Sequence, residues 1–552
     1  MAKRTDCLNT LRSSTRFFAR DEEGSFVIFT LFIFVVMIMI GGLAIDVMRF
    51  ENLRTKMQNT VDRAVLAAAD RDQSVTPQTV VDDYLAKAGM PADGYTVDVT
   101  ETKAGGIVTS RQVTVTAEAT LGTYFMKMMG TPTITAPAVS TAEEGINKIE
   151  ISLVLDVSGS MGAGTKLLDM QNAAKTFVSQ VLTDTEPGQV SINVIPYSTQ
   201  VNAGATLLDQ FTHTADHNYS HCVDFEATDF ASTTLDPTVT LQQSGHFDPW
   251  SSYARGTFAT MAASGRSPVW VCRTESSFEI SPWASNITDI HNKIDSFTAG
   301  GNTSIDVGVK WGSALLDPST RPVFNGLQAA GVVSGDFDTG RPYNHDPNDD
   351  VLKFIVVMTD GINTTQYMLD DAYNSGPSGV WKDPDTGRYS MYHEEYNDWD
   401  GDGDWREDVW YARNYGFSHG RYWIDNIYDS GTSNAVELTW PQLWNEMSLS
   451  HRAFSHFYQK YYNADHYYDN LYAPMDWVNA GTKDNRLDAV CTAAKSNDMI
   501  LFSIGFEVTD YSAGVMQSCA SSANHFYRVE GLEIEYAFES IANQINQLKL
   551  TQ

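Results

Sequence analysis

The chain has few basic residues for its length. Of its 552 residues, 37 are lysine or arginine and 69 are aspartate or glutamate, which gives a formal net charge of −32. Binding to nucleic-acid phosphates needs a basic surface, and the sequence contains no basic cluster that would supply one. The shortage therefore argues against a nucleic-acid partner. The acidic excess instead indicates a well-hydrated surface that attracts cations.

Cysteine is scarce, and its distribution is uneven. Cys7 precedes a long apolar run, and the other four cysteines follow it. An even number on one side of the run is typical of two disulfides in an oxidising compartment. Closeness along the chain favours the pairs Cys222–Cys272 and Cys491–Cys519. Four cysteines allow three connectivities, and reduced, buried cysteines are the alternative.

The chain also lacks the short motifs that mark common enzyme active sites. It has no H-E-x-x-H, G-x-S-x-G or P-loop motif and no constellation of paired carboxylates. Two serines described below, Ser158 and Ser160, have no histidine near them in sequence to act as a base. We therefore predict that the protein is not an enzyme.

Charged residues are absent from residues 26–45, a run of about 20 almost wholly apolar residues that could cross a bilayer as a helix. A buried core helix is the alternative, but this run is apolar on every face. A cleavable signal peptide would have a shorter apolar run and a nearby A-x-A site. We predict a transmembrane helix over 26–45. Basic residues flank both sides, so the orientation rests on the polar tail, 1–25, staying in the cytoplasm and the long acidic part going out.

Residues 46–90 are predicted to form a helical stalk. Leu53, Met57, Val61 and Val65 recur at spacings of three and four, and an alanine-rich stretch follows. The stretch from Asp46 to Ala69, after an apolar helix, resembles the N-terminal module of TadE/TadG-like proteins of the tight-adherence (Flp-type) pilus system. The resemblance covers about residues 20–70. A generic membrane-proximal stalk is the alternative.

Residues 91–147 change from helical to alternating periodicity. The alternation predicts strands over 96–100 and 113–117 with a turn over 103–106 between them. A short helix over 124–130 and another strand over 133–138 are expected next. We predict a small β-containing module, in which no residue pattern indicates chemistry.

Residues 148–552 alternate strands and helices, which predicts an α/β fold with a parallel sheet. Strands are expected over 149–156, 190–197, 354–360, 499–506 and 525–529. Helices are expected over 166–182, 287–297, 305–316, 485–496, 512–520 and 532–550. Two stretches, about 202–284 and 362–482, are too long for ordinary loops and are predicted to be insertions.

A carboxylate and two hydroxyls, Asp156, Ser158 and Ser160, follow the first strand of this region within five residues. Open α/β sheets bind ligands at the carboxyl ends of their strands. Asp360 ends another apolar strand, and Thr303 follows two glycines just before a helical pattern. Oxygen ligands of this kind suit a hard cation such as Mg²⁺. A serine–glycine turn that binds nothing is the alternative.

The sequence resembles the metal-ion-dependent adhesion site of von Willebrand factor A domains in three places. These are D-x-S-G-S, a later threonine that follows glycines, and T-D-G. The resemblance implies a Rossmann-like domain over 148–552. It implies that the motif residues hold Mg²⁺, or Mn²⁺ or Ca²⁺, some directly and some through water, and that a carboxylate from a protein partner completes the shell. The residues carried over are Asp156, Ser158, Ser160, Thr303 and Asp360.

The second insertion contains a short acidic run that matches the first half of an EF-hand-type Ca²⁺ loop. Carboxylates alternate along it and a glycine occupies the sixth position, where the loop turns sharply. The twelfth position is Val409 rather than a bidentate glutamate, so Glu407 or Asp408 would have to substitute. A solvated acidic turn is equally compatible with the run. The candidate ligands are Asp398, Asp400, Asp402 and Asp404.

Two further groups of side chains are ambiguous. His213, His217 and His221 stand four residues apart, a spacing that would align Zn²⁺ or Cu²⁺ ligands on a helix, but their segment is a poor helix former. We expect plain surface histidines. An aromatic run in the second insertion is either a recognition surface or internal packing. Its members are Tyr458, Tyr461, Tyr467, Tyr468, Tyr472 and Trp477.

Together these features predict a membrane-anchored binding or assembly protein of a bacterial envelope. The resemblances imply a single-pass protein of the inner membrane, with its C-terminal part periplasmic or extracellular, that works in Tad-type pilus biogenesis or adherence. Its partners would be components of the secretion or pilus machinery, or a surface ligand. Two other readings remain open: an envelope component whose metal only stabilises the domain, and a metal-assisted hydrolase.

Overall fold

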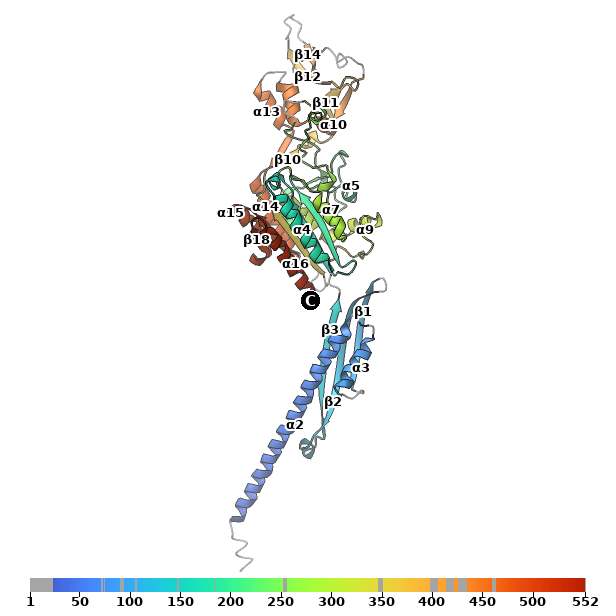
Figure 1. Ribbon diagram of the computed structural model, residues 1–552, viewed down its shortest axis with the longest axis vertical. Helices are drawn as coiled ribbons and strands as arrows, with labels where there is room; N and C mark the ends of the chain where they lie inside the picture. Colours follow the sequence, from blue (N-terminus) through green and yellow to red (C-terminus); the bar gives the residue numbers. More distant parts are fainter. Residues whose placement is uncertain are drawn as a thin grey trace, which may run out of the picture. The chain divides into compact units, whose positions relative to one another are not determined.

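The computed structural model describes residues 23–70, 73, 75–89, 94–104, 107–145, 148–183, 185–251, 256–345, 351–397, 406–413, 421–424, 434–458 and 463–551. The chain forms two compact units, Met1–Ile146 and Asn147–Gln552. Figure 1 shows the elements of both units.

In the residues that the structure describes, the first unit combines two helices with a three-stranded antiparallel sheet. Its helices are α2 (Glu23–Ala69) and α3 (Pro77–Lys87), and its strands are β1 (Tyr95–Ala104), β2 (Ile107–Gly122) and β3 (Thr133–Gly145), with the short 3₁₀ helix η1 (Met126–Met129) between the last two. The predicted helical stalk of residues 46–90 consists of two helices, because α2 ends at Ala69 and α3 begins at Pro77. The Thr76 side chain accepts a hydrogen bond from the Thr79 backbone N–H, and Pro77 opens the next helix.

The two halves of α2 have different surroundings. In the second half, Val61, Val65 and Ala68 are buried in one core with side chains of the sheet such as Val113 and Val115. Residues 26–45 are mostly exposed and apolar. Within the described part of the chain, α2 is the one helix that is long and apolar enough to cross a membrane.

The second unit is built on a six-stranded sheet. Its strands are β4 (Lys148–Asp156), β5 (Val190–Tyr197), β8 (Ser281–Ala284), β9 (Val351–Thr359), β17 (Ile500–Phe506) and β18 (Phe526–Val529). Their order is β18-β17-β9-β4-β5-β8, and only the β5–β8 pair among them is antiparallel. Counted along the chain, this is the doubly wound order 3-2-1-4-5-6. The predicted α/β fold is confirmed.

Helices cover both faces of this sheet. Buried side chains of α4 (Lys166–Leu182), α7 (Ile287–Asp295) and α16 (Glu533–Thr551) share a core with one face. Those of α8 (Ile305–Ala314), α9 (Arg321–Ala329), α14 (Ala480–Ser496) and α15 (Asp510–Cys519) share a core with the other. The strands β4, β5, β9 and β17 are buried on both faces, which is why they read as continuous apolar runs.

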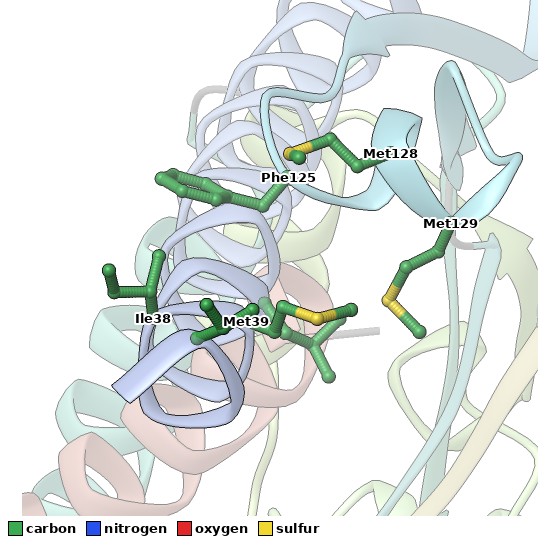
Figure 2. A pocket seen from close by; sticks show the side chains of 7 residues that line it. Ile38, Met39, Phe125, Met128 and Met129 are labelled. Atoms are coloured by element: carbon green, nitrogen blue, oxygen red, sulfur yellow. The ribbon is translucent and has the colours of Figure 1, made fainter. Parts of the chain in front are cut away.

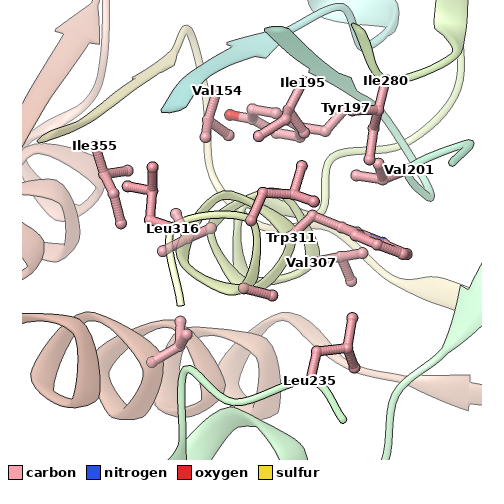
Figure 3. Packing of buried hydrophobic residues seen from close by; sticks show 14 of the residues in the cluster. Val154, Ile195, Tyr197, Val201, Leu235, Ile280, Val307, Trp311, Leu316 and Ile355 are labelled. Atoms are coloured by element: carbon pink, nitrogen blue, oxygen red, sulfur yellow. The ribbon is translucent and has the colours of Figure 1, made fainter. Parts of the chain in front are cut away.

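Helix α8 lies very close to the sheet. A Cβ added at Gly308 or Gly312 would lie 2.8 Å or 2.9 Å from the Val154 side chain, so only glycine allows this approach. Figure 3 shows Val307 and Trp311 of α8 among side chains of β4, β5 and β9. The helix that follows Thr303 is therefore held firmly against the central strands.

The first insertion is partly integrated into the main domain. It contains α5 (Ala205–Leu208), β6 (Val223–Asp224), η3 (Ala227–Ala231), β7 (Gln242–Gln243), α6 (Phe258–Ala262) and η4 (Ser276–Phe278). Phe211 and Phe225 pack edge-on against Trp311 of α8. Its predicted end at residue 284 is wrong, because residues 281–284 form β8, the edge strand of the main sheet. Four residues, with Trp283 at a φ of 43°, give no period that a strand prediction could detect.

The second insertion has a sheet of its own. Strands β10 (Gln366–Leu369) and β16 (Met475–Val478) pair at its base, and five antiparallel strands follow in the order β14-β13-β12-β11-β15. These are β11 (Pro377–Lys382), β12 (Tyr389–Asn397), β13 (Arg406–Arg413), β14 (Arg421–Ile424) and β15 (Val436–Thr439); the helical segments are η6 (Asp371–Tyr373), α10 (Trp440–Glu446), α11 (Leu449–Arg452), η8 (Ala453–Tyr458) and α13 (Ala464–Tyr472). Their core includes Phe247 and Val271 of the first insertion, so the two insertions pack together.

Two disulfides join the cysteines as closeness along the chain predicted. Cys222 is bonded to Cys272 within the first insertion, and Cys491 of α14 is bonded to Cys519 of α15. All four cysteines are buried. The second disulfide connects two helices on the same face of the main sheet.

Candidate metal centre

The candidate site lies where two central strands of the sheet end. Strands β4 and β9 are parallel neighbours, with Leu155 opposite Met358. Asp156 is the last residue of β4, and Asp360 follows Thr359, the last residue of β9. Parallel strands deliver their carboxyl ends to the same edge, so the two aspartates converge although they lie far apart in sequence.

Hydrogen bonds connect the two aspartates through the serine loop. The Ser160 hydroxyl donates to Oδ1 of Asp360 at 2.6 Å and lies 3.1 Å from the Ser158 hydroxyl. Asp156 accepts the Ser158 backbone N–H through Oδ1 and the Thr359 hydroxyl through Oδ2, both at 2.8 Å. Four of the five predicted ligands therefore belong to one network.

The loop that carries Thr303 is bonded to the other two loops. The Gly159 N–H donates to the Gly301 carbonyl and the Gly300 N–H donates to the Val157 carbonyl, each at 2.9 Å. Gly301 has a φ of 87°, and a Cβ there would lie 2.9 Å from Oγ1 of Thr199.

Thr303 itself is buried and exchanges two hydrogen bonds with Thr364, which lies four residues after Asp360. The loop containing Thr303 thus contacts both the serine loop and the loop after β9. The hydrogen bonds hold three separate segments at one edge of the sheet.

Burial and a neighbouring charge raise the proton affinity of Asp156. Asp156 is fully buried, and burial together with the nearby charge of Asp360 raises the pKa of the Asp156 carboxyl to about 6. Hydrogen bonds from Ser158 and Thr359 act in the opposite direction but are outweighed. A divalent cation between the carboxylates would remove this repulsion.

Lys166, the first residue of α4, is a neighbour of the site that sequence reasoning missed. Its Nζ lies 3.1 Å from Oδ2 of Asp360 and 3.3 Å from Oε2 of Glu507. Burial would lower the pKa of Lys166, but the hydrogen bonds and charges of Asp360 and Glu507 outweigh burial and raise it. Glu507 follows β17 with a φ of 55°, an uncommon conformation that aims its side chain here. No local motif connects these two residues with the serine loop.

Lys483 of α14 was also missed, and it holds the Thr303 loop from behind. Its Nζ donates to the Thr303 carbonyl and the Ser304 hydroxyl at 2.6 Å, and to the Thr364 carbonyl at 2.8 Å. Burial lowers the pKa of this ammonium to about 8, while the charge of Asp306 opposes that change. Lys483 is a positioning residue for the loop. In the sequence it is an ordinary helical lysine.

The donor set suits a hard cation. Two carboxylates and two serine hydroxyls, with the Thr303 loop beside them, offer only oxygen, which is the ligand type that Mg²⁺, Mn²⁺ and Ca²⁺ prefer. Among the described residues, no group of three or more histidine, cysteine, aspartate or glutamate side chains could hold a metal ion. The candidate site contains two carboxylates, those of Asp156 and Asp360, and its other oxygen donors are hydroxyls.

The other candidate cation sites have different outcomes. Asp398, Asp400, Asp402 and Asp404 lie outside the described residues, so Ca²⁺ binding there stays a prediction. The expectation of three surface histidines is wrong for His217, which is buried and lies 3.0 Å through Nε2 from the Ser244 carbonyl. It packs against Tyr219 and His246 inside the first insertion.

Acidification is expected to destabilise the first insertion through His246. This side chain is buried, its ring lies 4.0 Å from that of Trp270, and burial and His217 lower its pKa from 6.5 to about 3. The unfolded chain therefore binds a proton that the folded chain excludes, so stability falls as pH drops below 6.5. At pH 5 the loss should be about 2 kcal/mol.

The measurement is urea unfolding at pH 7 and pH 5 for the wild-type chain and His246→Phe. Phenylalanine keeps the ring packing and cannot be protonated. The variant should lose about 2 kcal/mol less than the wild type between the two pH values. Equal losses in both proteins would contradict the assignment of this pH dependence to His246.

Part of the predicted aromatic run lies on the surface of the second insertion. Tyr468 and Tyr472 of α13 are stacked, and Tyr472 packs edge-on against Trp477. All three side chains are exposed. Trp250 of the first insertion joins them through Tyr472. These residues form an exposed aromatic cluster to which both insertions contribute.

Comparison with known proteins supports the N-terminal resemblance. Residues 24–71 match the family model for Flp pilus-assembly TadE/G-like proteins. The match confirms the TadE/TadG resemblance predicted for about residues 20–70. A search of curated proteins found no match.

Solved structures with similarity to the chain include pilus proteins. The pilus adhesin SpaC from Lactobacillus rhamnosus GG is 12% identical with a TM-score of 0.31, over 82% of this chain and 34% of that one. The vWF domain of the type V pili tip protein Mfa5 from Porphyromonas gingivalis is 12% identical with a TM-score of 0.29. The match covers 72% of this chain and 95% of that one. The pilus adhesin RrgA from Streptococcus pneumoniae is 9% identical with a TM-score of 0.27, over 83% and 49%. The chain thus spans about a third of the length of SpaC, and these TM-scores are too low to add to what the sheet itself shows.

Proposed function

We propose that the protein is a membrane-anchored binding or assembly protein of the bacterial envelope that works in Tad-type pilus biogenesis or adherence. Residues 26–45 anchor it in the inner membrane, and the second unit lies in the periplasm or outside the cell. A divalent cation at Asp156, Ser158, Ser160, Thr303 and Asp360 accepts a carboxylate from a protein partner. The match of residues 24–71 to the pilus-assembly family supports the cellular process.

One observation carries the binding role: Asp156 and Asp360 meet beside the Ser158 and Ser160 hydroxyls at the carboxyl edge of the sheet. When bound, the cation supplies a positive centre for an anionic ligand. The chain's own residues position it, because the Thr303 loop and the serine loop are joined by backbone hydrogen bonds. Lys166 and Glu507 border the same edge. A partner that docks there therefore meets the positive side chain of Lys166 and the negative side chain of Glu507.

A photocrosslinking residue at Ile362 tests the proposal in the native cell. Ile362 is exposed two residues after Asp360. The expected result is a crosslink to an envelope protein that is lost on Asp156→Ala or on addition of a chelator. Val332, exposed in the loop after α9, serves as the control position, and any crosslink there should not change.

The same experiment distinguishes the alternatives. A crosslink at Ile362 that persists in Asp156→Ala and with chelator would contradict metal-dependent binding. If chelator lowered the melting temperature at the same time, the metal would have the purely structural role. A hydrolase assay with Ser160→Ala as the control tests the remaining reading, and turnover lost in that variant would favour an enzyme.

A further inference from the structure

The turn between β2 and β3 exposes large apolar side chains. It contains Tyr124, Phe125, Met126, Lys127, Met128 and Met129, which we call the apolar tip. The exposed fractions are 66% for Tyr124, 80% for Met128 and 62% for Met129. A water-facing turn usually consists of small and polar residues. A contiguous group of exposed large apolar side chains marks a surface that contacts something other than water.

The apolar tip packs beside the apolar half of α2. Phe125, Met128 and Met129 line one groove with Val35, Ile38, Met39 and Leu43 of the helix. Figure 2 shows the tip side chains beside Ile38 and Met39. Gly42 makes this contact possible, because a Cβ there would lie 2.2 Å from Cγ of Phe125. The tip thus adds exposed apolar side chains next to the exposed apolar side chains of residues 26–45.

Asp46 fixes the height of the tip along the helix. Its buried carboxylate accepts backbone N–H groups of Tyr124, Phe125 and Met126 at 3.0, 2.7 and 2.9 Å. Burial opposes ionisation, but these three donors and Arg49 outweigh it and hold the pKa of Asp46 below its usual value. The carboxylate therefore stays charged and keeps the turn in place.

Arg49 adds a second attachment. Its guanidinium lies 4.0 Å from the centre of the Tyr124 ring and donates to the Gly122 carbonyl at 3.2 Å. Asp46 and Arg49 are the first charged residues after the apolar run. The polar contacts of the tip thus lie at the end of the run, around Asp46, and Met128 and Met129 lie beside the run itself.

We infer that the apolar tip inserts into the lipid bilayer beside the transmembrane helix, as a second membrane contact of this chain. The inference rests on the proposed membrane anchoring by residues 26–45. Met39 lies seven residues before Asp46, which corresponds to about 10 Å along a helix. Met128 and Met129, which share the groove with Met39, therefore reach about 5–10 Å below the level of Asp46.

Lipid is the ligand of this surface, because the exposed apolar side chains of the tip adjoin those of the transmembrane helix. Ile38 and Ile40 of the helix are 45% and 64% exposed, and the tip adds to the same surface. A depth of 5–10 Å stays within one leaflet of a hydrocarbon core about 30 Å thick. Lys127 is the one charged residue of the tip, and its long side chain reaches the phosphate level from this depth. Two contacts with the bilayer fix the orientation of the β-sheet more firmly than one helix does.

Depth-dependent fluorescence quenching tests the inference on the full chain in vesicles of phosphatidylcholine and phosphatidylglycerol. Cys7 is replaced by serine, and a single thiol for an environment-sensitive dye is introduced as Met128→Cys, Ile38→Cys or Thr141→Cys. Thr141 is exposed on β3, well away from the tip. Nitroxide lipids carry the quencher in the headgroup or high on the acyl chain.

Dye at position 128 should be quenched by the acyl-chain nitroxide at least about 2-fold more than dye at position 141. Dye at position 38 must also be quenched if the helix spans the bilayer. Quenching at 38 without quenching at 128 would overturn the inference while leaving the anchoring intact, and would indicate that the tip faces water or a protein. Absence of quenching at 38 would overturn the anchoring itself, and with it the inference.

Discussion

Replacing Asp156 by alanine is expected to weaken Mg²⁺ binding at least about 100-fold, because loss of a metal-binding carboxylate costs more than loss of an outer partner. The carboxylate is buried and accepts hydrogen bonds from Ser158 and Thr359, so its position is set before any cation arrives. Removing it leaves Asp360, already paired with Lys166, as the single carboxylate of the motif. Isothermal titration with Mg²⁺ and Mn²⁺ measures the change.

Thermal unfolding provides an independent readout of the same prediction. Mg²⁺ at about 100 times its dissociation constant should stabilise the wild-type chain by about 2.7 kcal/mol and should not stabilise Asp156→Ala. Asp488→Ala, which removes an exposed carboxylate of α14, is the matched control and should retain the full response. An unchanged Mg²⁺ response in Asp156→Ala would show that the cation binds elsewhere.

Replacing Arg341 by alanine is expected to cost about 3–5 kcal/mol of unfolding free energy, because it breaks a buried ion pair and leaves a charge behind. Arg341 is fully buried at the opposite end of the sheet from Asp156. Its guanidinium donates to the Ser191 hydroxyl and the Gln189 carbonyl at 2.7 Å and lies 3.4 Å from Glu150. Glu150 is also fully buried and would keep the ammonium of Lys353 at 3.4 Å and the backbone N–H of Tyr343 at 3.3 Å, but would lose the guanidinium.

Urea unfolding followed by tryptophan fluorescence measures this loss. All 12 tryptophans lie in the second unit, so the signal reports that unit alone. Arg528→Ala is the control, since Arg528 pairs with Asp510 at the surface and such pairs contribute about 0–1 kcal/mol. Similar losses in the two variants would contradict the role assigned to the buried pair. Mg²⁺ affinity should stay unchanged in folded Arg341→Ala, which separates stability from cation binding.

Much of the main fold could be predicted from periodicity. The apolar runs that become β4, β5, β9 and β17 are buried on both faces. A continuous apolar run of this kind can be recognised from the segment's own sequence, without knowledge of its neighbours. Helix α4 begins and ends at the predicted residues because its apolar side chains recur at helical spacing. The edge strand β8 escaped detection, because its four residues contain a proline and a tryptophan at a φ of 43° and show no alternation.

The candidate site was predictable only in part. Asp156, Ser158 and Ser160 form a compact motif. Asp360 was found at the end of another apolar strand and Thr303 after two glycines, and the family resemblance joined them to that motif. Lys166, Glu507 and Lys483 could not be predicted, because each is an ordinary charged residue until the loops of β4, β9, β17 and α14 meet. Likewise, the residues of the apolar tip predict a short helix and give no indication of the groove they share with α2.

The sequence by itself determined the elements that have a regular pattern of apolar residues. These are the apolar helix, the core strands and the amphipathic helices. It also determined the serine loop, whose candidate oxygen donors lie close together in the chain. The tertiary structure alone decided which charges surround that loop, where Arg341 neutralises Glu150, and which side of α2 the apolar tip contacts. The physical reason is that the periodicity of apolar residues in a segment reflects only which of its faces are buried and which are exposed. Electrostatic partners and close packing depend on distances between segments that only the folded chain defines.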